Sequence, residues 1–389
     1  MVRVTDMTHG RPIRLILLFS LPLMLGSVFQ QLYTIVDTII IGRGVGMQAL
    51  ASIGAADWIN WLVLWGLQGF TQGFAILAAQ EFGAGAYDRL RRVLAMIVKL
   101  SCWFGIAVTI ISLLLVRPLL TLLHTDPAVF GGAQTYLYVQ FGGSLIIIAY
   151  NMAAAVLRCL GDSRTPLFAI IAASFANIAL DLLFVMGFGW GIFGASFATV
   201  LAQLIAFLLC LRSLRRLPFV QLTKADWKTD PAILLHLCRL GIPTGLQMSM
   251  ITLGGMVLQS VLNGFGVVFV AGYTGANKLY GILESASVAF GYAMTAYMGQ
   301  NRGARNAARI DAGIRAVLVL SAEFTAAIVT AMLVAGKPLL GLFLSTEEAG
   351  AADALAVAYQ YLMVLMAFLF ALFMLQAYRS SLQGLGEMT

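Results

Sequence analysis

The chain has 389 residues, of which 60% are hydrophobic and only 11% are charged. Soluble globular domains carry about 25% charged residues, which cover the surface that faces water. This composition excludes a soluble fold and predicts a polytopic membrane protein. The formal net charge of +7 arises in short loops between apolar stretches, a pattern of membrane topology that does not indicate nucleic-acid binding.

Ten long apolar runs follow one another along the chain. Only helices and closed barrels satisfy the backbone in lipid, and barrel strands are about ten residues long, so these runs predict helices. The runs cover residues 13–41, 46–80, 92–116, 128–157, 165–187, 190–212, 233–262, 266–299, 309–335 and 350–379. The polar, basic start lacks a small-residue cleavage site, so we expect the first run to be a retained helix.

Basic residues favour one set of the loops between these runs. On the side that holds both termini, 18 Lys and Arg residues lie in or beside the loops, against three on the other side, Arg43, Arg117 and Lys337. Loops rich in Lys and Arg stay in the cytoplasm. We therefore expect both termini to be cytoplasmic, with residues 213–232 as a basic cytoplasmic linker.

The second half of the chain repeats the first at an offset of about 220 residues. Pro22 corresponds to Pro243, and Pro118 corresponds to Pro338. Because an even number of spans separates the copies, the repeat is parallel, with its pseudo-two-fold axis along the membrane normal. Pro22 and Pro243 fall inside their predicted helices, where proline removes a hydrogen-bond donor, so we expect kinks there that are candidate hinges.

The repeat predicts an all-α polytopic membrane protein with two parallel-repeat six-helix bundles. An N-lobe of six helices covers residues 1–212, and a C-lobe covers residues 233–389. The second copy stops after four helices, so the chain resembles ten helices of a twelve-helix parent, with helices 11 and 12 absent. A natural ten-helix protein is the alternative.

Polar residues lie at one depth in the N-lobe. Asp37 and Asp181 lie well inside apolar runs, and Asn177 lies four residues before Asp181 on the same helical face. Counting from the outer ends of the runs places these three and Thr199 roughly 9–15 Å below the outer boundary. Charge at membrane depth is costly, so such residues are functional candidates.

These oxygen groups suit a hard cation, and two carboxyl groups in one site exchange protons in coupled steps. The pattern therefore predicts a cation- or proton-binding cluster, with structural polar contacts as the alternative. Glu284, a further acid inside an apolar run, either pairs with Lys278 or lines a cavity. The spacing of His and Cys residues suggests no metal or catalytic site, so we expect no enzyme and no cofactor.

Four segments of the chain resemble the multidrug and toxic compound extrusion (MATE) family. They are LPLMLGSVFQQLYTIVDTIIIGRGVG, AAQEFGAG, MGQNRGA and LRCLGDSRTP. Asp37, Asn177, Asp181 and Thr199 match the DinF-like bacterial branch, and the resemblance covers essentially the whole chain. It implies a MATE/MOP-type fold around a central cavity. It also implies an N-lobe cation site made by these four residues with the Ala195 carbonyl.

The resemblance implies export of organic cations and amphipathic drugs by antiport with H⁺ or Na⁺. Gln30, Tyr33 and Asn151 would line the substrate cavity. Other branches carry acids in the seventh and tenth helices, whereas the seventh helix here offers only Gln247, so coupling is expected to rest on the N-lobe. We expect a monomer in the bacterial inner membrane, with small-molecule substrates and membrane lipid as partners and no nucleic acid.

Two alternative functions remain open. A lipid-linked oligosaccharide flippase of the same superfamily would need several cationic side chains in its cavity, for which Lys99, Lys278 and Arg315 are the candidates. The missing helices also leave open a non-transporting membrane fragment.

Overall fold

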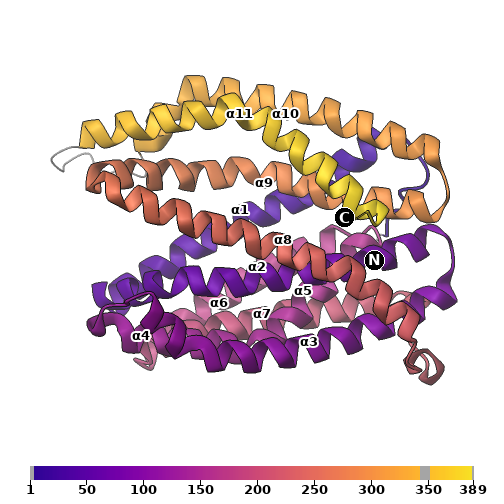
Figure 1. Ribbon diagram of the computed structural model, residues 1–389, viewed down its shortest axis with the longest axis horizontal. Helices are drawn as coiled ribbons and strands as arrows, with labels where there is room; N and C mark the ends of the chain where they lie inside the picture. Colours follow the sequence, from indigo (N-terminus) through magenta and orange to yellow (C-terminus); the bar gives the residue numbers. More distant parts are fainter. Residues whose placement is uncertain (1–3, 342–350, 388–389) are drawn as a thin grey trace.

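A computed structural model describes residues 4–341 and 351–387, and within these ranges the chain forms helices and no strands. The long helices lie side by side, with both termini toward the same end of the bundle (Figure 1). The α-helices are α1 (Pro12–Gly44), α2 (Met47–Gly83), α3 (Tyr87–Leu122), α4 (Pro127–Gly142), α5 (Ser144–Cys159), α6 (Arg164–Asp181), α7 (Gly191–Arg215), α8 (Pro231–Leu262), α9 (Val267–Gly303), α10 (Ala307–Gly341) and α11 (Ala351–Leu385). The predicted all-α membrane fold is confirmed.

Every predicted apolar run forms a helix or a pair of helices. The fourth run is bent by 50° between α4 and α5, at Gly143, where a Cβ atom would meet the side chain of Val200. In the described residues, eight helices and this bent pair are long and apolar enough to cross a membrane. Helix α9 is less apolar, and its second half, which includes the fully buried Phe290 and Tyr297, lies inside the protein.

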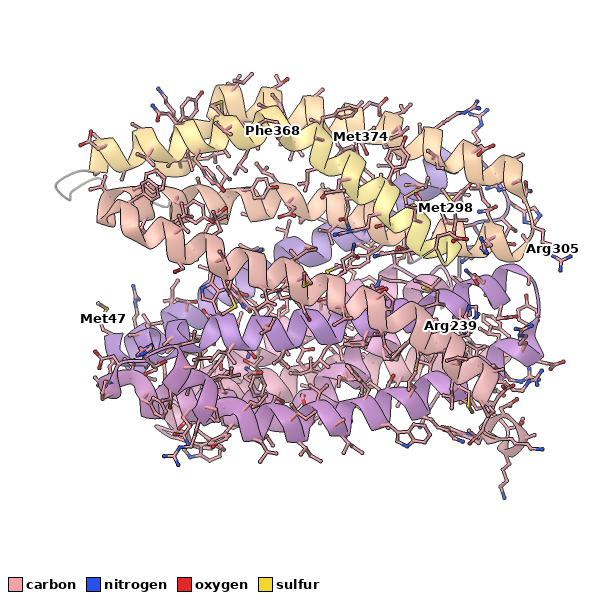
Figure 2. The ribbon with its side chains drawn as sticks, in the orientation of Figure 1. Met47, Arg239, Met298, Arg305, Phe368 and Met374 are labelled. Carbon is pink, nitrogen blue, oxygen red and sulfur yellow. The ribbon has the colours of Figure 1, made fainter. Side chains whose placement is uncertain are left out.

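Following the predicted repeat, we call α1–α7 the N-lobe and α8–α11 the C-lobe, although α8 packs mainly against α2. In the N-lobe, α6 packs against α1 and α7, and in the C-lobe α11 packs against α9 and α10. Between the lobes, α2 contacts α8 and α9, and α1 contacts α9. Arg239 and Arg305 lie at the end of the molecule that holds the termini, and Met47 lies at the opposite end (Figure 2).

Glycines permit the close crossing of α2 and α8. Gly69 and Gly73 lie one turn apart on α2 and face Gly241 and Gly245 of α8. A Cβ atom at Gly73 would lie 2.6 Å from the Leu240 carbonyl oxygen. Small residues at such spacing let membrane helices approach backbone to backbone.

The segment before α1 fastens the two lobes at the end that holds the termini. The backbone amide of buried Met7 donates to Gln300 Oε1 of α9 (2.8 Å), and Gln300 Nε2 donates to the Cys159 carbonyl of α5 (2.9 Å). Arg309 of α10 donates to the Met7 and Gly10 carbonyls, at 2.9 Å each. One segment therefore bridges helices of both lobes.

The connection between the lobes contains the short helices η2 (Pro218–Val220) and η3 (Lys224–Trp227). The carboxylate of Asp226 accepts hydrogen bonds from the amide and hydroxyl of Thr223, both at 2.7 Å. Burial alone would raise the pKa of Asp226, but these hydrogen bonds and the charge of Arg91 outweigh burial and hold that pKa below its usual value. The linker is therefore an ordered segment that packs against α3.

Candidate functional site

Helix α6 carries the two fully buried polar residues of the predicted cluster. Asn177 and Asp181 lie one turn apart and are both inaccessible to solvent. Asp181 is the last residue of α6, and a π-helical turn, η1 (Leu182–Gly187), follows it directly. Such turns are rare and frequently occur at functional sites. The π-helical turn therefore directly follows the residue that carries the buried carboxyl group, Asp181.

Helix α1 brings Asp37 to Asp181. The two carboxyl groups are near enough to interact electrostatically, and the surrounding cluster of Ile40, Ile41 and Val185 is apolar. One oxygen of Asp37 and both oxygens of Asp181 are buried and have no hydrogen-bond partner in the described part of the chain.

Buried polar atoms are almost always hydrogen-bonded, so each exception requires an explanation. The same holds here for the amide group of Asn177, whose Oδ1 and Nδ2 atoms are both buried without a partner in the described residues. The carboxyl oxygens and Asn177 Oδ1 are acceptors that a cation or a proton could satisfy, whereas Asn177 Nδ2 is a donor that needs an acceptor.

Helix α7 supplies the remaining groups. The Thr199 hydroxyl donates to the Ala195 carbonyl at 3.2 Å. A carbonyl oxygen has two lone pairs, so the Ala195 oxygen can accept this bond and still face a second partner. The Thr199 oxygen likewise keeps its lone pairs free for a ligand.

A small cavity lies beside two members of the cluster, Asn177 and Thr199. Its volume is about 40 Å³, and the lining residues that matter here are Gln30, Tyr33, Asn177 and Thr199. A drug-sized ligand needs about 300–1,000 Å³, whereas a single water needs only about 10–15 Å³. The cavity therefore suits water or a small ion, and it excludes a drug.

Two residues predicted to line the substrate cavity lie outside this small cavity. Asn151 donates to the Ile147 carbonyl of its own helix at 2.9 Å, and Gln247 of the C-lobe accepts from Gln383 Nε2 at 2.9 Å. Neither is among the residues that line the small cavity. Pro22 and Pro243 lie inside α1 and α8, as predicted, and both helices continue through them.

Asp57 was not among the site residues predicted from the sequence. This residue lies on α2, partly buried, and interacts electrostatically with Asp37. An acid inside the second apolar run was the available signal. The N-lobe therefore gathers three carboxyl groups, from α1, α2 and α6.

Glu284 lies near a different positive charge from the one predicted. It interacts electrostatically with Arg379 of α11, whereas Lys278 forms no ion pair with it in the described residues. Arg158 and Arg379, which lie at the ends of the fourth and tenth predicted apolar runs, are inside α5 and α11 in the structure.

Within the described residues, no group of three or more His, Cys, Asp and Glu side chains has the geometry of a metal site. The N-lobe cluster instead mixes carboxylate, amide, hydroxyl and carbonyl oxygens. Such a set suits Na⁺ or a proton, which would be cargo and not a resident cofactor.

Comparisons with known proteins agree with this architecture. The family model MatE matches residues 22–183 and 243–389. The probable multidrug resistance protein YpnP of Bacillus subtilis (strain 168) is 33% identical over 368 residues, which are 93% of this chain and 80% of the relative.

Two solved structures share the fold. A MATE protein in complex with MaL6 has a TM-score of 0.91 at 24% identity, over 100% of this chain and 86% of that chain. A multidrug resistance MATE transporter of the MOP superfamily, described as outward-facing, has a TM-score of 0.90 at 24% identity, over 99% and 86% of the two chains.

Proposed function

Because the chain belongs to the MATE family and is a membrane transporter, not an enzyme, we propose that it is a secondary active multidrug efflux antiporter. It exports organic cations and amphipathic drugs in exchange for H⁺ or Na⁺. The observation that carries this proposal is the interacting pair Asp37 and Asp181, of which one Asp37 oxygen and both Asp181 oxygens are buried without a hydrogen-bond partner in the described residues.

Coupling in this proposal is a difference in affinity between two states, as linkage requires. With the transporter open outward, H⁺ or Na⁺ binds between Asp37 and Asp181 and weakens the binding of a cationic substrate. The loaded transporter turns inward and releases the ion, and the recharged carboxylates then favour a new substrate. A bend at Pro22 in α1 would move Asp37 relative to Asp181, and Pro243 is the matching hinge in the C-lobe.

The proposed ion ligands are Asp37, Asp181, Asn177, Thr199 and the Ala195 carbonyl. Their oxygens serve either ion. Sodium would use the amide, hydroxyl and carbonyl oxygens as well as the carboxylates, whereas a proton needs only the carboxyl pair.

The proposed substrate-binding groups are Gln30, Tyr33, Asn151 and Gln247. Two of them, Gln30 and Tyr33, also line the small N-lobe cavity, so they are positioned to contact both a substrate and the ion site. This arrangement supports a local competition between ion and substrate.

We further propose that the protein is a monomer in the bacterial inner membrane with both termini in the cytoplasm. The basic residues of the loops support this orientation, since they concentrate on the side of the termini. The bacterial origin of the relatives supports the assignment to a bacterial inner membrane.

Two of the three cations that a flippase would need, Lys99 and Arg315, lie apart from each other. Lys99 donates to the Trp227 carbonyl and to Thr229 of the linker, at 2.6 and 2.9 Å. Arg315 lines a groove of about 490 Å³ with Arg11. Lys99 and Arg315 therefore do not share one cavity in which they could hold a pyrophosphate together.

Transport of ethidium into inverted proteoliposomes tests the proposal. With an imposed pH or sodium gradient, we expect gradient-dependent uptake of ethidium, and collapse of the gradient should abolish it. Uptake that is equal with and without both gradients would contradict antiport.

A further inference from the structure

Arg158 reaches from the N-lobe onto an aromatic ring of the C-lobe. Its guanidinium carbon lies 4.7 Å from the centroid of the Tyr292 ring on α9. The hydroxyl of the same tyrosine accepts a hydrogen bond of 2.6 Å from Gln68 of α2. Tyr292 is therefore held from the N-lobe at both its face and its hydroxyl.

A second arginine approaches the same tyrosine from α11. Arg379 is hydrogen-bonded to Gln376 of its own helix and interacts electrostatically with Glu284 and Tyr292 of α9. Neither arginine belongs to the ion pairs of the described residues. We call Arg158, Tyr292, Arg379, Gln376 and Glu284 the interlobe arginine cluster.

The cluster has more positive than negative charge and unused donors. It holds two guanidinium groups against the single carboxylate of Glu284. The Nε atoms of Arg158 and Arg379 are both buried and have no hydrogen-bond partner among the described residues. The carboxylate of Asp162, close to Arg158 in sequence, is already hydrogen-bonded by the start of α6.

Charged groups inside a membrane protein pair with one another or mark a substrate pathway. All five side chains of the cluster are only partly buried, so a ligand can reach them. Guanidinium groups present a planar fork of donors that matches a carboxylate or phosphate. Because Arg158 lies on one lobe and Arg379 on the other, an anion between them would contact both lobes.

We propose that the interlobe arginine cluster binds the acidic group of an amphipathic substrate, so that the exported compounds include amphiphilic acids. This inference rests on the proposed transport function and adds a substrate class to it. The ligand contributes the missing negative charge, and its apolar part lies among the apolar helices that surround the cluster.

A pair of ligands that differ only in charge tests the proposal. The probes are dansyl-aminoundecanoic acid and its methyl ester, titrated by fluorescence against the purified protein in neutral detergent. We expect the acid to bind the unmodified protein at least tenfold more tightly than the ester. Arg158→Gln and Arg379→Gln should each weaken binding of the acid by about 10- to 100-fold, which is the loss of one charged hydrogen bond, and leave the ester unchanged.

Two control variants sharpen the result. Arg164→Gln removes an exposed arginine at the start of α6 and should leave both probes unaffected. Asp181→Asn should abolish ion coupling and leave binding of the acid intact, which separates this proposal from the ion mechanism.

Several results would overturn the inference. They are equal affinity of acid and ester in the unmodified protein, equal loss in Arg164→Gln, or displacement of the acid by phosphatidylglycerol at its membrane abundance, which would assign the cluster to bulk lipid. The comparison of the two probes needs no variant, so it remains decisive if Arg158→Gln or Arg379→Gln fails to fold.

Discussion

The crossing of α2 and α8 gives a quantitative prediction for Gly73→Ala. The new Cβ atom would lie 2.6 Å from the Leu240 carbonyl oxygen and 2.5 Å from the Gly241 Cα atom. Ordinary van der Waals contact begins near 3.4 Å, so the two helices must separate by about 0.8 Å or more. Overpacking of this kind costs about 1–3 kcal/mol.

This cost applies only to the arrangement in which α2 and α8 are packed together. If the lobes rock against each other during transport, a cost of about 1–3 kcal/mol shifts the equilibrium about 5- to 150-fold away from the packed state. We therefore expect Gly73→Ala to favour a state in which the distance between the outer ends of α2 and α8 differs from that in the parent protein.

Spin labels at Met47 and Val261, exposed residues near the outer ends of α2 and α8, measure that separation by pulsed electron resonance. The native cysteines would first be replaced. Gly54→Ala is the matched control, because it lies on the same helix and its Cβ atom meets nothing within 4 Å. A distance distribution in Gly73→Ala that matches both the parent and Gly54→Ala would refute the reasoning.

Further predictions concern the N-terminal segment, the linker and the choice of ion. Gln300→Ala removes the hydrogen bond from the Met7 amide, so trypsin should cleave the N-terminal segment about tenfold faster; an unchanged rate would contradict the bridging role. Asp226→Asn should speed hydrogen exchange of the linker peptide at neutral pH. Because the pKa of folded Asp226 is lowered, its stabilisation is complete above about pH 4 and is lost as the pH falls further, so the variant and parent should converge in acid. Thr199→Val removes one oxygen ligand at nearly constant shape and should weaken Na⁺ binding about tenfold if sodium is the cargo; equal Na⁺ affinity with intact proton release would favour H⁺.

Hydrophobic patterning predicted the helices well because lipid imposes a minimum length of apolar sequence. It did not predict the break between α4 and α5. The sequence there has no proline. At the bend, a Cβ atom on Gly143 would lie 2.5 Å from a methyl carbon of Val200, a close approach between residues that are distant in sequence.

The candidate ion site was partly accessible from the sequence. Depth counting placed Asp37, Asn177, Asp181 and Thr199 at one level. The helices bring Asp37 to Asp181 and place Asn177 and Thr199 at one small cavity. Asp57 was missed although it lies inside an apolar run, and its proximity to Asp37 depends on how α1 and α2 pack.

The interlobe arginines were missed for a different reason. Arg158 directly follows the fourth predicted run and Arg379 ends the tenth, so both were counted among the basic residues that flank the helices. Helix α11 nevertheless extends to Leu385 and α5 to Cys159, because the backbone continues its hydrogen bonding inside the protein beyond the apolar sequence.

The measurement that tests the central claim most directly is ion release on addition of substrate to the purified protein. Ethidium is added in weakly buffered detergent solution while the pH is followed, first without and then with sodium. We predict proton release by the parent protein and none by Asp181→Asn, with sodium suppressing release if the two ions compete for the site. Binding of ethidium with the same ion release in Asp181→Asn as in the parent would contradict coupling through the buried N-lobe carboxylates.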